Sequence, residues 1–504
     1  MKKVLLIIAF ASLTLSGIGQ TLNIIGKVKN PSAQSAELNI PFDGAYHQSN
    51  SIYSKPNAKG GFRFSLRKAK PKFVTLLYKQ QERYLLLMPG EPLYLNFDAG
   101  DMASTLHVIG KAKTYNELLL KSALNDQSFL INKLSDNKKW SADSLLNIML
   151  PDVNAELNTS LKAINKSNTT KAIKVLLSTE LKYYYANQLM AFTRSIMFKN
   201  SRQTAWKKVE DAVVNATPLP NTAQFNASPQ ASTYLHEYTL HQFKEIGLLI
   251  REKPTGAKSL IEQQMGMPYD TAMSLGNQYG EDYLLAAISH KYLPQNAEER
   301  LLTNMTLHYI DTKNLKFAKR LQQDLSANFP NSPYLKISGE RILALEKTMA
   351  ENEKNKDIVF IPADTKITSL KDLIAPYKGK AVYVDIWGTW CGPCVQEIVE
   401  HSAQLKTKFK DKNVVFLYLE MDYNKDTAKW KEFVNIHNLT GYHVRASQTE
   451  MENIWIDLLN TRNVPRLFPT YVIFDTHGNL SDKNAKRPSD GELLYSQIEA
   501  ALNK

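Results

Sequence analysis

The stretch that decides the fold is Val382-Tyr383-Val384-Asp385-Ile386-Trp387-Gly388-Thr389-Trp390-Cys391-Gly392-Pro393-Cys394. Its first half is a run of apolar residues, which predicts a buried strand, and the residues that follow it have the spacing of a helix. The two cysteines therefore lie where a strand passes into a helix. Free backbone N–H groups and the positive end of the helix dipole meet at that point. Both stabilise a thiolate, so we expect Cys391 to be a nucleophile.

The cysteine count supports a reactive pair. The chain of 504 residues contains two cysteines, and both belong to this C-x-x-C. A structural zinc site needs four ligands, and there is no second pair. His236 and His241 lie five residues apart, whereas the zinc-protease motif needs its two histidines four apart on one helical face. We therefore predict a redox-active Cys391–Cys394 disulfide and no metal site, with Cys394, one helical turn further in, resolving the mixed disulfide.

The residues from Trp387 to Cys394 resemble the active-site loop of the thioredoxin superfamily. More closely, they resemble the exported bacterial TlpA/ResA-like thiol–disulfide oxidoreductases, over residues 357–504. The resemblance implies a C-terminal α/β thioredoxin-like fold and an enzyme of the protein-disulfide reductase type. It also implies that no cofactor is needed, because the dithiol itself carries two electrons.

The resemblance assigns roles to further positions. Pro469 would follow a cis peptide bond, and the backbone of Phe468 would pair with the client; a trans proline at a strand edge is the alternative. Asp385 would be a buried acid that relays a proton to or from Cys394, unless it faces water at the strand end. Glu397 would be an acid near the cysteines, or else an exposed helix residue. The predicted substrate-binding residues are Trp390, Gly392, Pro393, Phe468 and Pro469.

Two features depart from a minimal thioredoxin. Tyr418 occupies the strand position where thioredoxins carry a lysine, and the stretch 421–468 is longer and should hold an extra helix and strand. The Gly392-Pro393 dipeptide resembles that of reducing thioredoxins. This favours a reductase or isomerase of protein disulfides over an oxidase.

The N-terminus predicts export. A basic start is followed by an apolar run at 4–15 and small residues at 17–19, the layout of a secretory signal peptide at 1–19. No cysteine follows the run, so we expect no lipid anchor, and no later stretch is long and apolar enough for stable membrane insertion. We therefore expect a periplasmic protein.

Two further regions precede the cysteine domain. Short alternating runs separated by Gly and Pro predict a small all-β, sandwich-like domain at 20–111. Apolar residues at three- and four-residue spacing predict an all-α domain at 112–350, and a charged segment at 346–356 links it to the last domain. Between Ser489 and Glu492 a capping box should open the final helix. The fold class is thus multidomain.

The charge pattern and the family resemblance bear on the expected binding partners. The net charge is +13, but the lysines are scattered, so we expect no nucleic acid. Protein thiol and disulfide clients are the expected partners, and the resemblance implies an electron donor of the DsbD/CcdA type in the membrane. A homo-oligomer stays open. The alternative is a binding or scaffold protein in which the first 350 residues carry the main role.

Overall fold

The computed structural model describes residues 21–67, 70–126, 141–199, 203–252, 254–362, 365, 367–421, 427–459 and 466–504. Within it the chain forms two compact units. The N-terminal unit consists of residues 1–311 and 320–334, and the C-terminal unit of residues 312–319 and 335–504. Each unit is described by itself below.

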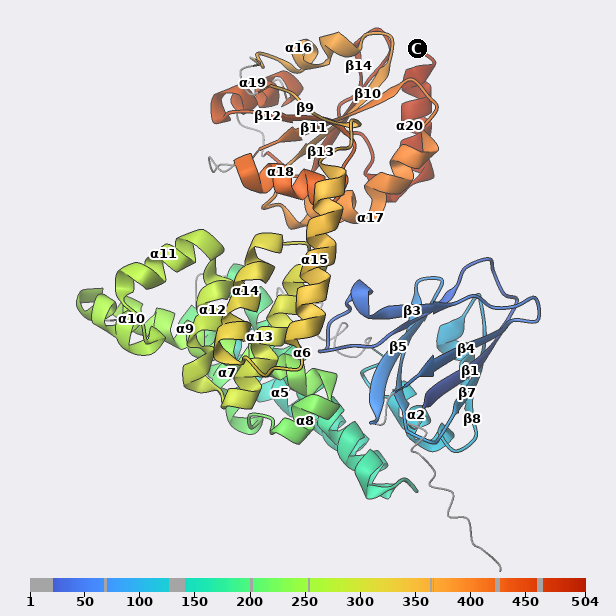
Figure 1. The fold of residues 1–504 in the computed structure, drawn as a ribbon, viewed down its shortest axis with the longest axis vertical. Coiled ribbons are helices and arrows are strands. Elements are labelled where there is room, and N and C mark those ends of the chain that lie inside the picture. Colours follow the sequence, from blue (N-terminus) through green and yellow to red (C-terminus); the bar gives the residue numbers. More distant parts are fainter. Residues whose placement is uncertain are drawn as a thin grey trace, which may run out of the picture. The chain divides into compact units, whose positions relative to one another are not determined.

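The C-terminal unit is built on a six-stranded sheet with the order β14-β13-β10-β11-β12-β9 (Figure 1). The central strand β10 pairs with β11 in parallel and with β13 antiparallel. All of its residues are buried, as expected for a strand covered by helices on both faces. The strand bounds are Ile358–Phe360 for β9, Ala381–Trp387 for β10, Val414–Glu420 for β11, Gly441–Arg445 for β12, Thr470–Phe474 for β13 and Leu480–Asp482 for β14.

Helices cover both faces of this sheet. Alternate residues of β10 point to opposite faces. Val382, Val384 and Ile386 pack in one cluster with side chains of α16 (Leu370–Ile374) and α19 (Gln448–Leu459). Tyr383 and Trp387 pack on the other face, in clusters that include α17, α18 and α20. These three helices span Gly392–Lys408, Thr427–Ile436 and Glu492–Leu502. The predicted α/β architecture is confirmed.

The final helix begins differently from the prediction. The capping box predicted between Ser489 and Glu492 is wrong, because α20 starts at Glu492 after Gly491, with no side-chain cap. A short 3-10 turn at Pro488–Asp490 precedes it. The backbone N–H and the hydroxyl of Ser489 instead bind the carboxylate of Glu397. The very short elements β9 and β14 were not predicted, because three residues are too few to show a period.

In the N-terminal unit the strands form two four-stranded sheets, ordered β4-β1-β7-β8 and β3-β2-β5-β6. Strand β1 alternates between buried and less buried side chains, the pattern of a sheet with one face in a core. The short alternating runs predicted to be strands in this region do form strands. The bounds are Leu22–Lys29 for β1, Ala36–Asn39 for β2, Ser51–Ser54 for β3, Gly61–Leu66 for β4, Lys72–Tyr78 for β5, Gln81–Leu87 for β6, Leu93–Asp98 for β7 and His107–Ile109 for β8.

Helices follow the strands along the chain. The longest is α6, Lys171–Lys199, which packs against α9, Pro229–Glu252. The other long helices are α5 (Leu150–Lys166), α7 (Gln203–Ala216), α11 (Tyr269–Tyr279), α12 (Glu281–Tyr292), α13 (Gln295–Asp311), α14 (Leu315–Asn328) and, in the C-terminal unit, α15 (Leu335–Asn352). Shorter helices are α1 (Met102–Thr105), α2 (Lys113–Leu120), α4 (Ala142–Ser144), α8 (Thr222–Ala227) and α10 (Ala257–Met265). Strand-rich and helix-rich segments share one compact unit, so their division into two domains at residue 111 stays a prediction.

The predicted signal peptide at 1–19 lies outside the described residues. Within the described parts of the chain, we find no helix with the length and apolar character that crossing a membrane requires.

Candidate active site

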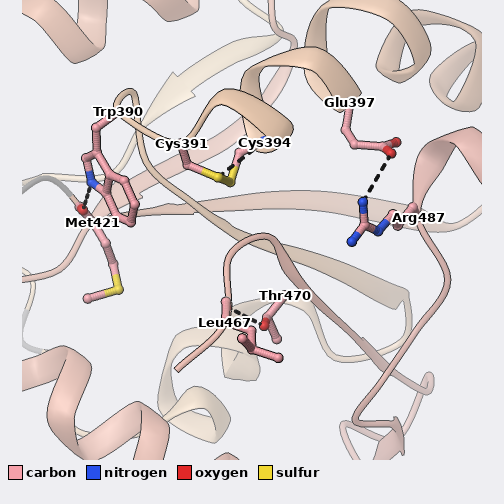
Figure 2. Close-up of a disulfide and its surroundings, with 8 residues drawn as sticks. All are labelled: Trp390, Cys391, Cys394, Glu397, Met421, Leu467, Thr470 and Arg487. Atoms are coloured by element: carbon pink, nitrogen blue, oxygen red, sulfur yellow. Dashed lines mark hydrogen bonds and ion pairs between the residues drawn. A yellow bond between two sulfur atoms is a disulfide. The ribbon is translucent and has the colours of Figure 1, made fainter. Parts of the chain in front are cut away.

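The two cysteines lie at the N-terminus of α17, directly beyond the end of β10. Cys391 is the N-cap residue of the helix, and its Sγ accepts a hydrogen bond from the backbone N–H of Cys394 at 3.2 Å. The pair forms a disulfide (Figure 2). Cys391 is 4% exposed and Cys394 is 1% exposed, so Cys391 is the slightly more accessible of the two. The predicted strand–cysteine–helix order is confirmed.

This position favours an anionic sulfur at Cys391. The first N–H groups of a helix have no partner within it, and here one of them points at Sγ. The helix dipole adds a positive partial charge at the same end. Pro393 lies in the first turn, where a missing N–H costs no helical hydrogen bond.

Two aromatic side chains, Trp390 and Phe468, pack together next to the disulfide. Trp390 is half exposed, and its indole N–H donates to the carbonyl oxygen of Met421 at 2.9 Å (Figure 2). The indole also meets the ring of Phe468 edge-on, with centroids 5.1 Å apart. Gly388 permits this arrangement, because a Cβ there would lie 2.6 Å from the indole nitrogen of Trp390.

The loop before β13 supplies the other side of the site. The peptide bond between Phe468 and Pro469 is cis, so that prediction is confirmed and the trans alternative is wrong. Phe468 packs against the buried cluster that contains both cysteines. Leu467 is 67% exposed, and its carbonyl accepts a hydrogen bond from the hydroxyl of Thr470 at 2.8 Å (Figure 2).

Asp385 is buried, as the resemblance implies, and does not face water. It is 2% exposed, and one of its carboxylate oxygens has no hydrogen-bond partner. Burial raises its pKa well above the ordinary value, and the nearby negative charge of Glu397 raises it further. An acid of this kind holds its proton at a pH where an exposed carboxyl has lost it.

Glu397 is also buried, at 7% exposed, so the alternative of an exposed helix residue is wrong. Its two carboxylate oxygens accept hydrogen bonds from the N–H of Ser489 at 2.9 Å and from the hydroxyl of Ser489 at 2.7 Å. The guanidinium of Arg487 lies 4.0 Å away (Figure 2). Ser489 and Arg487 were not predicted, because they lie about 90 residues along the chain and no local pattern marks them.

Tyr418 lies opposite Asp385 in the register of β10 and β11, as the alignment of the strand implied. The sequence did not point to Lys406, a residue of α17. Its ammonium lies 4.8 Å from the centroid of the Tyr418 ring and donates to the carbonyl oxygen of Thr440.

One group of candidate metal ligands occurs among the described residues, in the N-terminal unit: Asp211, His241 and Glu245. The ammonium of Lys207 already lies 2.7 Å from the carboxylate of Asp211 and 3.1 Å from that of Glu245. A lysine thus supplies the positive charge there.

Comparison with known proteins agrees with this geometry. The Redoxin family model matches residues 349–502. Thiol-disulfide oxidoreductase ResA of Bacillus thuringiensis (strain Al Hakam) is 35% identical over 159 residues, which cover 32% of this chain and 80% of the relative. The chain belongs to the ResA-like thiol–disulfide oxidoreductases of the thioredoxin superfamily. Its ResA-like domain is an enzyme of that class.

Two further similar proteins have lower identities. The ResA of Geobacillus kaustophilus (strain HTA426) is 28% identical over 142 residues, covering 28% of this chain and 72% of the relative. A solution structure of a thiol:disulfide interchange protein from Bacteroides sp. is 22% identical, with a TM-score of 0.22 over 27% of this chain and 78% of that chain.

Proposed function

We propose that the ResA-like domain reduces or isomerises disulfides of client proteins, with Cys391 as the nucleophile and Cys394 as the resolving thiol. The observation that carries the proposal is the position of the Cys391 sulfur at the N-cap of α17, where it accepts the N–H of Cys394. A thiolate there gains from the helix dipole, whereas the Cys394 sulfur lies deeper.

The exchange has two steps. The Cys391 thiolate attacks a client disulfide; a bond forms between Cys391 and one client sulfur, and the other client sulfur leaves as a thiolate. Cys394 then loses its proton and attacks the Cys391 sulfur, which closes the Cys391–Cys394 disulfide and releases the second client thiolate. Two electrons pass to the client. Asp385 takes the proton from Cys394, since it is a buried carboxyl on the strand that leads into the cysteine loop.

The client would lie along the loop that ends at Pro469. In this proposal the backbone of Phe468 pairs with an extended client segment next to the disulfide. Trp390 flanks the segment with its half-exposed ring, and Gly392 and Pro393 form the surface around the sulfur. The exposed side chain of Leu467 adds apolar area at the same rim.

The location and the electron supply belong to the proposal as well. The apolar run after the basic start favours export to the periplasm. An exported reductase must recover two electrons after each turnover, and the family resemblance suggests a membrane thiol transporter of the DsbD/CcdA type as donor.

Cysteine variants test this function directly. Cys391→Ser should abolish reduction of a protein disulfide, because no mixed disulfide can form. Cys394→Ser should instead accumulate a mixed disulfide at Cys391, and mass spectrometry then identifies the attached client. Disulfide reduction by the Cys391→Ser variant at the wild-type rate would contradict the proposal.

The direction of exchange needs a separate measurement. Equilibration of the pure protein with glutathione buffers gives the reduction potential of the pair. We expect a reducing value, nearer to thioredoxin than to the strongly oxidising DsbA. A value at the oxidising end would favour an oxidase.

A second candidate function rests on the N-terminal unit. It contains a cavity of about 610 Å³ whose lining includes Asn39, Tyr84, Tyr184 and Gln230. The amide oxygen of the buried Asn39 has no hydrogen-bond partner. A cavity of this size, with an unpaired polar atom on one of its lining residues, suits a bound ligand. This favours a binding module with the redox domain as an accessory. A cellular phenotype that persists in Cys391→Ser would support this second function.

A further inference from the structure

The face of the sheet that α17 covers carries a buried acid among packed aromatic side chains. Asp385 lies between Tyr383 and Trp387 on β10, so the alternation of the strand directs all three to the face that α17 covers. Tyr418, the register partner of Asp385, packs in the cluster that contains Cys394. The buried acid, the resolving cysteine and the Tyr418 ring therefore share one face of the sheet.

Lys406 approaches the same face of the sheet from α17. It follows Ser402 by one turn, and Ser402 belongs to the buried face of α17. Its ammonium lies 4.8 Å from the centroid of the Tyr418 ring, and the carbonyl of Thr440 accepts its hydrogen bond. The ring of His443 stacks on the same tyrosine, with centroids 5.1 Å apart. The lysine thus has a defined position rather than a free, solvated one.

We propose that Lys406 is a positioning residue whose charge favours the ionised form of Asp385 and so governs proton transfer from Cys394. The cation of this helix residue lies at the ring of Tyr418, the register partner of Asp385, so the facing strand position itself carries a neutral side chain. The inference rests on the proposed role of Asp385 as the proton acceptor.

The electrostatics agree with this geometry. The positive charge of Lys406 lowers the pKa of Asp385 against the larger effects of burial and of Glu397. Burial lowers the pKa of Lys406 itself to about 7, while Asp385 raises it. The titratable and charged groups that face Asp385 or Lys406 come from four strands and the helix: Tyr383, Tyr418, His443, Tyr471, Glu397 and Lys406.

Among these groups Lys406 supplies the positive charge that acts on Asp385. The three tyrosines stay neutral, because burial raises the pKa of each above the ordinary value. Burial lowers the pKa of His443 to about 3, so its ring is neutral as well. Loss of the lysine charge should therefore leave the Asp385 carboxylate without electrostatic support.

The lysine acts in the second step of the exchange. When Cys394 attacks the Cys391 sulfur, its proton passes to the Asp385 carboxylate, and the client sulfur leaves with the electron pair. Only ionised Asp385 can take the proton. Well below the pKa of Asp385, raising that pKa by one lowers the ionised fraction about tenfold and so slows this step by up to that factor.

The test is the titration of Asp385 in full-length Lys406→Met. Infrared difference spectroscopy detects the protonated carboxyl, and loss of the band in Asp385→Asn assigns it. We expect Lys406→Met to raise the apparent pKa of Asp385 by about one pH unit, and Lys406→Arg to keep it near the wild-type value. Lys406→Gln carries the same prediction if the methionine variant does not fold.

Lys408 offers a matched control on the same helix. It is exposed and lies 3.8 Å from Glu492, so Lys408→Met removes the same charge from the surface of the helix. It should leave the titration of Asp385 unchanged. An unchanged titration in Lys406→Met, or an equal change in Lys408→Met, overturns the proposal.

A second readout separates this inference from the proposed function. In stopped-flow exchange, Lys406→Met alone should slow closure of the Cys391–Cys394 disulfide. In the double variant with Asp385→Asn, Lys406→Met should cause no further slowing. Additive effects in the double variant overturn the inference and leave the exchange function intact. If instead Asp385→Asn closes the disulfide at the wild-type rate, the role of Asp385 itself is wrong.

Discussion

One buried ionisable group in each unit, His47 and Asp385, shows how differently such groups are partnered. In the N-terminal unit, the imidazole of His47 lies between two carboxylates, 2.9 Å from Asp43 and 2.8 Å from Asp311. In the C-terminal unit, Asp385 is equally buried but has an oxygen without any hydrogen bond. A buried charge with partners on both sides holds a structure together, whereas a buried acid that lacks them is available for reaction. We therefore call His47 with Asp43 and Asp311 the structural cluster, and the surroundings of Asp385 the chemical cluster.

The largest effect should follow from breaking the structural cluster. His47→Leu leaves Asp43 and Asp311 facing each other without the cation. Loss of one partner from a buried ionic group typically costs about 3–5 kcal/mol. We expect this loss in the free energy of unfolding of the N-terminal unit, measured by urea titration with hydrogen-exchange mass spectrometry on peptides from 22–98. Exchange activity at Cys391 should not change.

The same cluster predicts a pH dependence with a defined sign. Burial disfavours the charged ring of His47, but the hydrogen bonds and charges of both aspartates outweigh burial and raise its pKa to about 9. Its contribution to stability is therefore complete below about pH 6.5, the ordinary histidine value, and is lost as the pH rises through 9. His107, exposed on β8, is the matched control, and His107→Leu should change stability by less than about 0.5 kcal/mol.

Substitution of Asp385 should change the stability of its unit in the opposite direction to His47→Leu. Asp385→Asn should stabilise the C-terminal unit, because the pKa of Asp385 is raised by burial and the native state holds a proton that the unfolded chain releases. From the unfolded pKa near 3.8 up to the native pKa, the wild type loses about 1.4 kcal/mol per pH unit relative to the variant. Thermal unfolding at several pH values measures this. A constant difference between wild type and Asp385→Asn at every pH would contradict it.

The smallest effect is expected from a change in the packing of Trp390 beside the disulfide. Gly388→Ala places a Cβ 2.6 Å from the indole nitrogen of Trp390 and 3.2 Å from the carbonyl of Met421, so the indole must shift. Overpacking of this kind costs about 1–3 kcal/mol. We expect a raised KM for a protein client with a nearly unchanged reduction potential. Gly247→Ala in α9 is the control, because nothing lies within 4 Å of its Cβ position and it is not part of the client surface.

Much of the C-terminal unit could be predicted from local patterns. The apolar run before the cysteines predicted β10, and the cysteine spacing predicted the start of α17. These features depend on neighbours within a few residues. The prediction of a capping box at Ser489 was wrong because it used only neighbouring residues. They do not show that the hydroxyl donates to the distant carboxylate of Glu397.

The sequence by itself determined the reactive cysteine pair and its place between a strand and a helix, and the family resemblance added the cis proline. Only the tertiary structure decided what surrounds them: Lys406 over the Tyr418 ring, Ser489 on Glu397, and His47 paired with Asp311 across 264 positions of the chain. The physical reason is the range of the interactions. Helix starts and strand alternation arise from adjacent residues, whereas the partner of a buried charge is known only once the chain has folded around it.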